Sequence, residues 1–362
     1  MFGRYFCRIL CRNRVVLRIL SSLFGEKDMA SKQPLIIEVL RGSVVESQHQ
    51  VMAVVVNEVG NLVQYWGHPQ YLTMPRSAIK MLQALPLIES GAADKFNLEA
   101  KHIALACASH RGEKDHLAAL SQWMEKAGLK EAQYVCGPHL PYDEASAHEM
   151  IRKSQKPTVL CNNCAGKHSA IISTCLHLGE DPTGYEKYEH SAQKRLRKVL
   201  SETMRIDHSK VPYGVDGCGI PTYGVPLQNM AIGMSTFINP KEAPARKVAA
   251  ERILHAVRSH PFYISGSDNF ATAVIEKSQG RAVIKGGAEG VFCGVLPEKK
   301  VAFAVKAADG AGRAAQAATA MLLLQLGGLN ESEFKALSKF TMSPVTNWRG
   351  DVVGQIRIAK GS

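Results

Sequence analysis

A serine and a lysine three residues apart stand where the sequence predicts the start of a helix. Pro75 and Arg76 end an extended run and helix-forming residues follow, so Ser77 falls in or just before the first turn and Lys80 one turn later. A serine hydroxyl becomes a good nucleophile when a neighbour accepts its proton, and a lysine can do so if burial or another cation keeps it partly neutral. Ser-x-x-Lys also arises by chance in helices, so this interpretation depends on the rest of the chain.

Three cysteines form a second group of residues that could do chemistry. Cys161 and Cys164 are three residues apart, and Lys167 follows them. Cys218 lies beside Asp216 in a Gly-rich segment. The pattern allows a thioredoxin-like redox pair, buried structural cysteines, or a metal or activated-nucleophile site. If Cys218 reaches Cys164, two thiolates and a nitrogen ligand would suit zinc, but the spacing alone leaves the three alternatives open.

A lysine followed by two glycines stands late in the chain. Lys285-Gly286-Gly287 follows a strand predicted for residues 281–284, and such glycines let another backbone or a ligand approach closely. Together with Ser77-x-x-Lys80, this order resembles serine β-lactamases and penicillin-binding proteins, where Ser-x-x-Lys opens a helix and Lys-Thr-Gly lies on a late strand. At this point we take the resemblance as one of architecture only.

Composition and charge describe an ordinary globular chain. It has 362 residues, 46% hydrophobic and 21% charged, enough for one large domain or two joined domains. The net charge is +12, but after residue 28 no Lys/Arg block contains interleaved aromatics, which argues against nucleic-acid binding. The nine cysteines are scattered and odd in number, and no run is apolar enough to cross a bilayer. We therefore expect a cytoplasmic protein without a membrane partner.

Residues 1–28 differ from the rest because they mix arginines with Phe, Ile, Leu and Val. A start codon assigned too far upstream, an amphipathic targeting segment and a signal sequence are the competing interpretations. Arg12, Arg14 and Arg18 interrupt the apolar run, which argues against a signal peptide. We favour the first interpretation and expect residues 1–28 to be an extension outside the fold, with residues 29–362 forming one catalytic domain.

The elements that must position these residues are strands, then many helices, then strands again. Strands are predicted at 35–40, 51–57, 61–65, 281–284 and 301–305, and helices at 77–91, 116–127, 144–154, 169–178, 190–204, 240–259 and 312–326. Residues 103–108 are predicted as a buried strand or core segment that carries Ser109 to a turn, and residues 212–221 as a loop. This order predicts an α+β fold (α/β sandwich) in which N- and C-terminal strands share one antiparallel sheet with helices around it. A helical region is inserted between the N-terminal and the C-terminal strands.

Five motifs in this order resemble the rhizobial-type (class 3, asparaginase II family) L-asparaginases. They are Pro75-Arg76-Ser77-Ala78-Ile79-Lys80 with Gln83-Ala84-Leu85-Pro86-Leu87, Ala108-Ser109-His110, Cys161-Asn162-Asn163-Cys164-Ala165-Gly166-Lys167-His168, Val215-Asp216-Gly217-Cys218-Gly219 and Lys285-Gly286-Gly287-Ala288-Glu289-Gly290. The resemblance spans roughly residues 35–358 and has no counterpart for the first 28. It implies a glutaminase/serine β-lactamase-like fold, a homodimer, and an amidohydrolase that converts L-asparagine to L-aspartate and ammonia.

The resemblance also implies catalytic roles. Ser77 would be the nucleophile and Lys80 its proton acceptor, while Ser109 and Lys285 would form a second Ser-Lys tandem in the same pocket. Two lysines near two serines can lower each other's pKa, so that one serves as a base while the other stays charged.

A zinc site is implied by the same resemblance. Cys164, Lys167 and Cys218 would be the ligands and Asp216 would hold a metal-bound water, whereas Cys161 would be structural. Zinc held by two thiolates is nearly charge-compensated, so it would position substrate or water rather than act as the main Lewis acid.

Other functions fit the same residues. A glutaminase or a D,D-peptidase-like acyl transferase would use the same scaffold with another substrate. A protein of a different class, a non-catalytic zinc-binding module, would use Ser77 and Ser109 only to cap helices.

Overall fold

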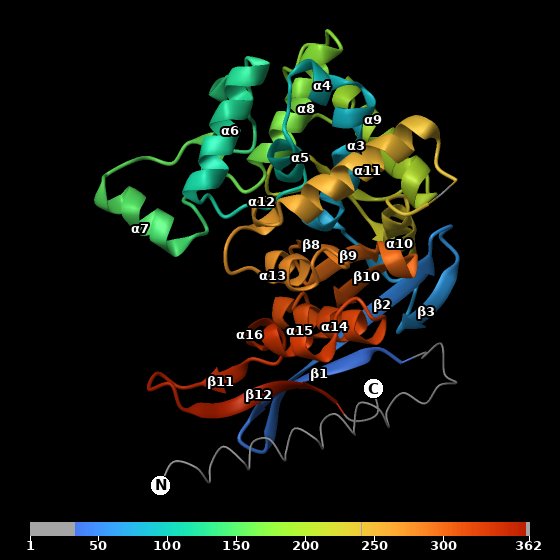
Figure 1. Ribbon diagram of the computed structural model, residues 1–362, viewed down its shortest axis with the longest axis vertical. Coiled ribbons are helices and arrows are strands. Elements are labelled where there is room, and N and C mark those ends of the chain that lie inside the picture. Colours follow the sequence, from blue (N-terminus) through green and yellow to red (C-terminus); the bar gives the residue numbers. More distant parts are fainter. Residues whose placement is uncertain (1–32, 240, 360–362) are drawn as a thin grey trace.

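The computed structural model describes residues 33–239 and 241–359, and in this range an antiparallel sheet is covered by helices (Figure 1). Residues 1–28, with Cys7 and Cys11, lie outside the described residues. The division of the chain into an extension and one catalytic domain therefore stays a prediction.

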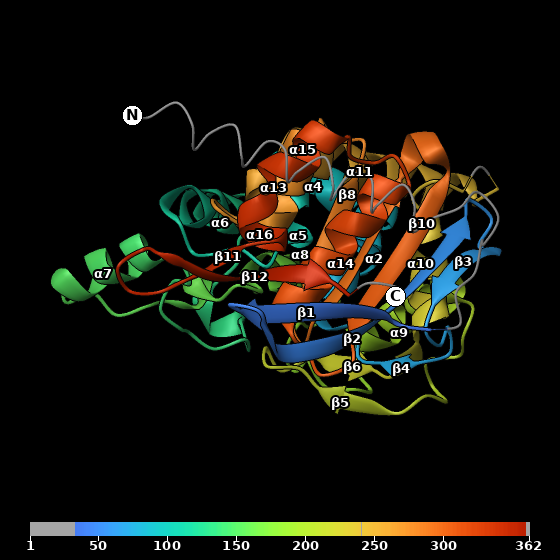
Figure 2. The ribbon, with the colours of Figure 1, turned by 90° about the horizontal axis from the view of Figure 1, so that it is seen from below.

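Strands from both ends of the described chain share one sheet. Its order is β11-β12-β1-β2-β10-β9-β8, with β3 paired to β2, and all neighbours are antiparallel (Figure 2). The strands are β1 Leu35–Arg41, β2 Val44–Asn57, β3 Leu62–Trp66, β8 Val283–Gly287, β9 Val291–Leu296, β10 Val301–Ala307, β11 Pro344–Thr346 and β12 Val352–Ile358. The predicted α+β class, with N- and C-terminal strands in one sheet, is confirmed.

The long strand β2 shows how the sheet separates two cores. Met52, Val54 and Val56 belong to the larger buried cluster, whereas Ala53 and Val55 belong to the other. Side chains alternate between the faces of a strand, and here both faces are apolar. The sheet is therefore a middle layer with helices packed on each side.

Helices from different parts of the chain cover the two faces. On one face α10 (Leu227–Ser235) packs against β2 and β10, with most of the other helices from the middle of the chain stacked beyond it (Figure 1). These are α2 Lys80–Gln83, α3 Leu85–Glu89, α4 Ala92–Lys95, α5 Ala100–Ala106, α6 Lys114–Ala127, α8 Ala165–His177, α9 Ser191–Met204, α11 Pro244–Ser259 and α12 Phe262–Ser265. Helix α7 (Glu144–Arg152) projects away from them (Figure 1). The smaller core on the opposite face is formed with α13 Phe270–Lys277, α14 Gly312–Gln325, α15 Glu331–Ala336 and α16 Ser338–Thr341.

Most predicted helices are present, and their ends have local causes. Helix α6 ends at Gly128, whose φ of 64° is a left-handed conformation that glycine adopts without a Cβ penalty. The helix predicted for residues 77–91 is instead three short pieces, η1 (Arg76–Ile79), α2 and α3. Pro86 lies in the first turn of α3, where a backbone N–H has no partner within the helix. The N–H that proline lacks therefore costs no helical hydrogen bond.

Three other expectations need correction. Residues 103–108 are a buried core segment, which was one of the two alternatives, but they are not a strand, because α5 covers most of them. A short apolar run alone does not distinguish a buried strand from a buried helix. Residues 212–221 are not only a loop, since β5 (Tyr213–Val215) pairs with β6 (Pro221–Tyr223) to form a hairpin. Lys285 lies within β8 rather than after it, and strands β9, β11 and β12 were not predicted.

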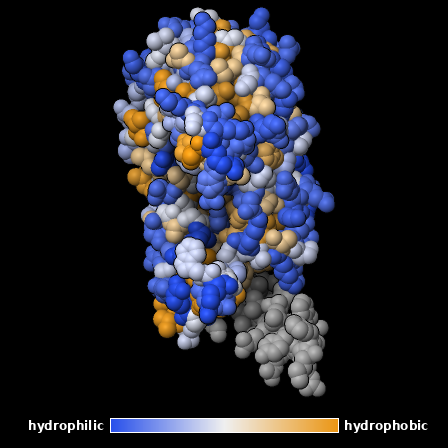
Figure 3. Space-filling view, turned by 90° about the vertical axis from the view of Figure 1, so that its left-hand side faces the viewer, coloured by the Kyte–Doolittle hydropathy of each residue, from blue (hydrophilic) through white to orange (hydrophobic). Residues whose placement is uncertain are grey.

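The surface agrees with an ordinary folded chain. The side of the molecule from which α7 projects is mostly hydrophilic, with scattered apolar side chains (Figure 3). Every helix in the described ranges is too short or too polar to cross a bilayer.

Candidate active site

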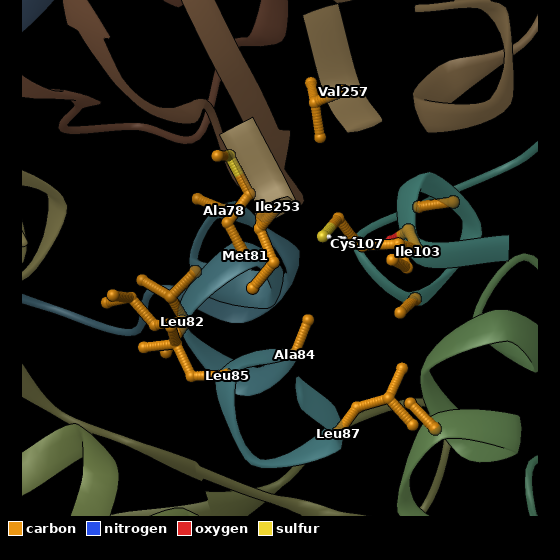
Figure 4. Packing of buried hydrophobic residues seen from close by; sticks show 14 of the residues in the cluster. Ala78, Met81, Leu82, Ala84, Leu85, Leu87, Ile103, Cys107, Ile253 and Val257 are labelled. Carbon is orange, nitrogen blue, oxygen red and sulfur yellow. Dashed lines mark hydrogen bonds between the residues drawn. The ribbon is translucent and has the colours of Figure 1, made fainter. Parts of the chain in front are cut away.

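The Ser77 turn packs against the helical core. Helix α2 begins at Lys80, whose N–H donates to the Ser77 carbonyl. Ala78 and Met81 are fully buried among apolar side chains of α5 and α11 (Figure 4). This packing leaves Ser77 half-buried and Lys80 fully buried.

The buried amine of Lys80 points to residues of other elements. Its Nζ lies 2.5 Å from the Ala108 carbonyl oxygen, 3.2 Å from Ser109 Oγ and 3.2 Å from Cys164 Sγ. Lys80 therefore links the Ser77 turn to the motif that contains Ser109 and to the motif that contains Cys164.

Ser109 lies between two lysines. Its hydroxyl receives hydrogen bonds from Lys285 Nζ at 2.9 Å and from Lys80 Nζ at 3.2 Å, while its own N–H donates to the Ile264 carbonyl. Burial, and next the charge of Lys80, lower the pKa of Lys285 to about 7. A proton acceptor with a pKa near neutrality is thus in direct contact with a serine hydroxyl.

The glycines after Lys285 let β8 approach the Ser77 turn. β8 is the last strand on its side of the described sheet, and it packs against η1. A Cβ placed on Gly287 would lie 2.8 Å from the Pro75 carbonyl oxygen and 2.9 Å from the Ala78 nitrogen. Only glycine fits here without displacing the Ser77 turn, as the sequence pattern suggested.

The predicted zinc ligands also come together. Cys164 precedes α8 and Lys167 lies in its first turn, while Cys218 lies in the turn of the β5–β6 hairpin. Lys167 Nζ is 2.9 Å from Cys218 Sγ. A Cβ on Gly166 would lie 2.0 Å from the Leu105 carbonyl oxygen, so glycine allows α8 to pack closely on α5 and brings this group next to Lys80.

The charges of this group depend on each other. A hydrogen bond from Cys218, together with the charges of Lys80 and Lys167, lowers the pKa of Cys164 well below that of a free thiol despite its burial. The same pairing and burial raise the pKa of Cys218. Burial alone would lower the pKa of Lys167, but the charges of Cys164 and Cys218 outweigh it and raise the pKa. Cys164 is therefore the favoured thiolate.

The donor set of Cys164, Lys167 and Cys218 fits a zinc ion in chemistry. Two sulfur donors and one amine suit this borderline-soft metal, and three protein ligands leave a position open. Within the described ranges, no three His, Cys, Asp or Glu side chains are placed to hold a metal ion, so the site depends on the lysine. Zinc binding remains a prediction.

Arg76 and Asp216 form an ion pair across the site. The Arg76 guanidinium lies 2.7 Å from Asp216 Oδ1, although the two residues are far apart in sequence. Burial would raise the pKa of Asp216, but the hydrogen bond from Arg76 and the charges of Lys167 and Arg76 together outweigh it and lower the pKa. Arg76 has a φ of 50°, a left-handed conformation that costs about 1–2 kcal/mol for a residue with a Cβ. The ion pair helps to offset this cost and fixes the residue before Ser77.

These residues line one cavity of about 480 Å³. Its wall includes Ser77, Ser109, Cys164, Cys218 and Lys285. Lys80 and Lys167 are almost completely buried and contact the wall residues from behind. The structure thus gathers all eight predicted site residues from five separate segments, although it does not test their roles.

Cys161 is separate from this group. It lies in the turn η3 (Val159–Cys161), and burial raises the pKa of its thiol. All seven described cysteines are free thiols, so Cys161 and Cys164 are not joined as a disulfide.

The cavity is also lined by Arg76, His139 and Tyr142, for which no role was predicted from the sequence. Arg76 stands next to Ser77 within a quoted motif, and this adjacency was a usable signal. His139 and Tyr142 lie in the segment between α6 and α7, where no spacing pointed to the site.

Comparison with known proteins identifies the family. The sequence model of the family described as L-asparaginase II matches residues 37–358, and the chain belongs to this family. It is accordingly a hydrolase of the asparaginase type. The comparison with curated proteins returned no match. Among solved structures, a beta-lactamase-like protein from Bacteroides dorei DSM 17855 is similar with a TM-score of 0.38 and 10% identity, covering 82% of this chain and 89% of that one.

Proposed function

We propose that this protein hydrolyses L-asparagine to L-aspartate and ammonia with a Ser-Lys nucleophile. The observation that carries the proposal is the contact of two lysine amines with Ser109 Oγ, at 2.9 and 3.2 Å, in the cavity that Ser77 also lines. Membership of the family supports the substrate, and this contact supports the mechanism.

In the proposed mechanism Ser77 Oγ attacks the carbonyl carbon of the side-chain amide. Lys80 follows Ser77 by one turn and accepts the proton, and Ser109 passes it between Lys80 and Lys285. The departing ammonia takes a proton from this network, and a water molecule then hydrolyses the aspartyl ester. The steps need no redox partner, and the nucleophile is regenerated.

Two features can stabilise charge in this reaction. Backbone N–H groups of the Ser77 turn and of the free edge of β8 can donate to the oxyanion, since Gly287 brings these segments together. Arg76 is the cation on the cavity wall that suits the α-carboxylate, and its ion pair with Asp216 fixes its direction.

Cys164, Lys167 and Cys218 would hold zinc in this account. When bound, the ion supplies positive charge that positions the substrate or a water. The lysine would bind only as a free amine, and its proton must therefore leave before the metal enters.

A second assignment keeps the reaction and changes the nucleophile. Ser109 has both lysine contacts, whereas the amine of Lys80 bonds to Ser109 rather than to Ser77. Hydrogen bonds of catalytic groups are often long before substrate binds, so we retain Ser77 as the nucleophile. The two assignments predict opposite results for substitutions of the two serines.

Three further properties belong to this proposal. We propose a homodimer because the resemblance to the class 3 asparaginases implies one. We propose a cytoplasmic location because the scattered, odd-numbered cysteines suit a reducing compartment. Substrate discrimination is proposed to favour asparagine over glutamine.

The test is ammonia release from asparagine and from glutamine by wild type, Ser77→Ala and Lys80→Ala. Loss of a nucleophile or its base should lower kcat by roughly 10³-fold or more. Lys198→Ala and Ser338→Ala are matched controls, because both side chains are exposed and lie outside the cavity. Ammonia release from glutamine instead of asparagine would identify a glutaminase. Acylation by penicillin would identify a peptidase-like transferase, and no ammonia release from either amide would indicate a non-catalytic protein.

A further inference from the structure

The cavity is larger than its proposed substrate requires. Its volume of about 480 Å³ lies within the range of roughly 300–1,000 Å³ seen for pockets that hold drug-sized ligands. Free asparagine is much smaller than such a ligand. Part of the cavity must therefore lie beyond an asparagine bound at Ser77 and Ser109.

Two aromatic rings line this cavity without a role in the proposed chemistry. The rings of His139 and Tyr142 stack with centroids 4.6 Å apart and planes 28° from parallel. Tyr142 is 57% exposed, so its ring still has apolar surface that a ligand could cover. We call this pair of rings the aromatic platform.

Hydrogen bonds hold the aromatic platform in place. His139 Nε2 accepts from the Asn163 N–H at 3.1 Å, and the Tyr142 carbonyl accepts from Arg111 Nη2 at 2.7 Å. The Arg111 carbonyl in turn accepts a hydrogen bond from the Asp143 N–H. These bonds orient the His139 ring and anchor the backbone of Tyr142, and such preorganisation reduces the entropy lost on binding.

The platform adjoins the reactive groups by two routes. Asn163 is the neighbour of Cys164, whose sulfur contacts the Lys80 amine at 3.2 Å. The Asn163 carbonyl also accepts from the N–H of His110, the neighbour of Ser109. The rings therefore line the same cavity as the two serines and are connected to their neighbours through Asn163.

We propose that the aromatic platform is a subsite for a substituent on the amide nitrogen, so that the enzyme also hydrolyses N-aryl β-amides of L-aspartate. This proposal rests on the proposed function. The serine oxygen would bond to the β-carbonyl carbon, the carbon–nitrogen bond would break, and the arylamine would leave with one proton. Water would then release aspartate from the ester.

The probe is the β-(4-nitroanilide) of L-aspartate, whose cleavage releases coloured nitroaniline. We expect wild type to cleave it, and Tyr142→Ala to lower the ratio of kcat/KM for the anilide to kcat/KM for asparagine. Aromatic stacking accounts for about a two- to tenfold change in this ratio. Tyr142→Phe keeps the ring and should keep the ratio. Trp348→Ala is the control, because this ring is fully exposed and lies outside the cavity.

The outcomes separate the two proposals. Hydrolysis of asparagine without cleavage of the anilide, or an unchanged ratio in Tyr142→Ala, would overturn the subsite and leave the proposed function intact. If wild type hydrolyses neither compound, the proposed function fails and the subsite fails with it.

Discussion

Replacing Gly287 with alanine should separate β8 from the Ser77 turn. The new Cβ would lie 2.8 Å from the Pro75 carbonyl oxygen and 2.9 Å from the Ala78 nitrogen. Ordinary contacts of a Cβ begin at 3.4 Å, so the two backbones must move apart by about 0.6 Å. Both obstructing atoms belong to the backbone, and neither can rotate away.

The expected cost is mainly catalytic. A misplacement of about 1 Å can cost roughly 10²-fold in rate, so a movement of this size should lower kcat for asparagine by about ten- to a hundredfold. Overpacking should also destabilise the fold by about 1–3 kcal/mol. Ammonia release and thermal unfolding measure the two effects.

Gly312→Ala is the matched control for this experiment. Gly312 lines the same cavity, and a Cβ there would meet no atom within 4 Å. The control should keep wild-type kcat within about twofold. A Gly287→Ala enzyme with kcat within twofold of wild type would refute the inference that β8 and the Ser77 turn must touch for catalysis.

Three other predictions address the proton acceptor, the metal and the N-terminal segment. Because Lys285 has a pKa of about 7 and accepts a proton only as the free amine, kcat/KM should rise with pH through about 7, and the pH profile of Lys285→Arg should lack this rise. Cys164→Ser and Lys167→Ala should each lower the zinc content of the purified protein and raise KM for asparagine. Zinc content should also fall as pH drops, because protons compete with the metal for the lysine amine. Unchanged zinc content in both variants would remove the zinc site from this account. Deleting residues 1–28 should change neither ammonia release nor melting temperature, and a truncated chain that fails to fold would contradict this.

Regular patterns made the sheet and most helices predictable. The continuous apolar run of β2 and the alanine-rich stretch of α14 each carry a clear signal, and both elements are present. The strand β12 was missed although Ile356 and Ile358 alternate with polar residues, because only pairing with β1 makes this short run a strand. The run at residues 103–108 was ambiguous because its residues are apolar on every side.

The motifs predicted which residues would lie together, but not the contacts among them. The spacing of Ser77 and Lys80 indicated that the two side chains could meet, yet the Lys80 amine bonds to Ser109. Local spacing does not specify this, because the position of Ser109 depends on how α5 and α8 pack. The Arg76–Asp216 ion pair depends likewise on the β5–β6 hairpin, which was predicted as a loop.

The most direct test of the Ser77 assignment is covalent labelling of the nucleophile. A diazoketone analogue of L-asparagine, in which a reactive group replaces the side-chain amide, should attach to the attacking serine, and peptide mass analysis should then locate it. The account predicts one label on the peptide that contains Ser77, and its loss in Lys80→Ala. A label on the Ser109 peptide, or no labelled serine in a protein that releases ammonia from asparagine, would contradict it.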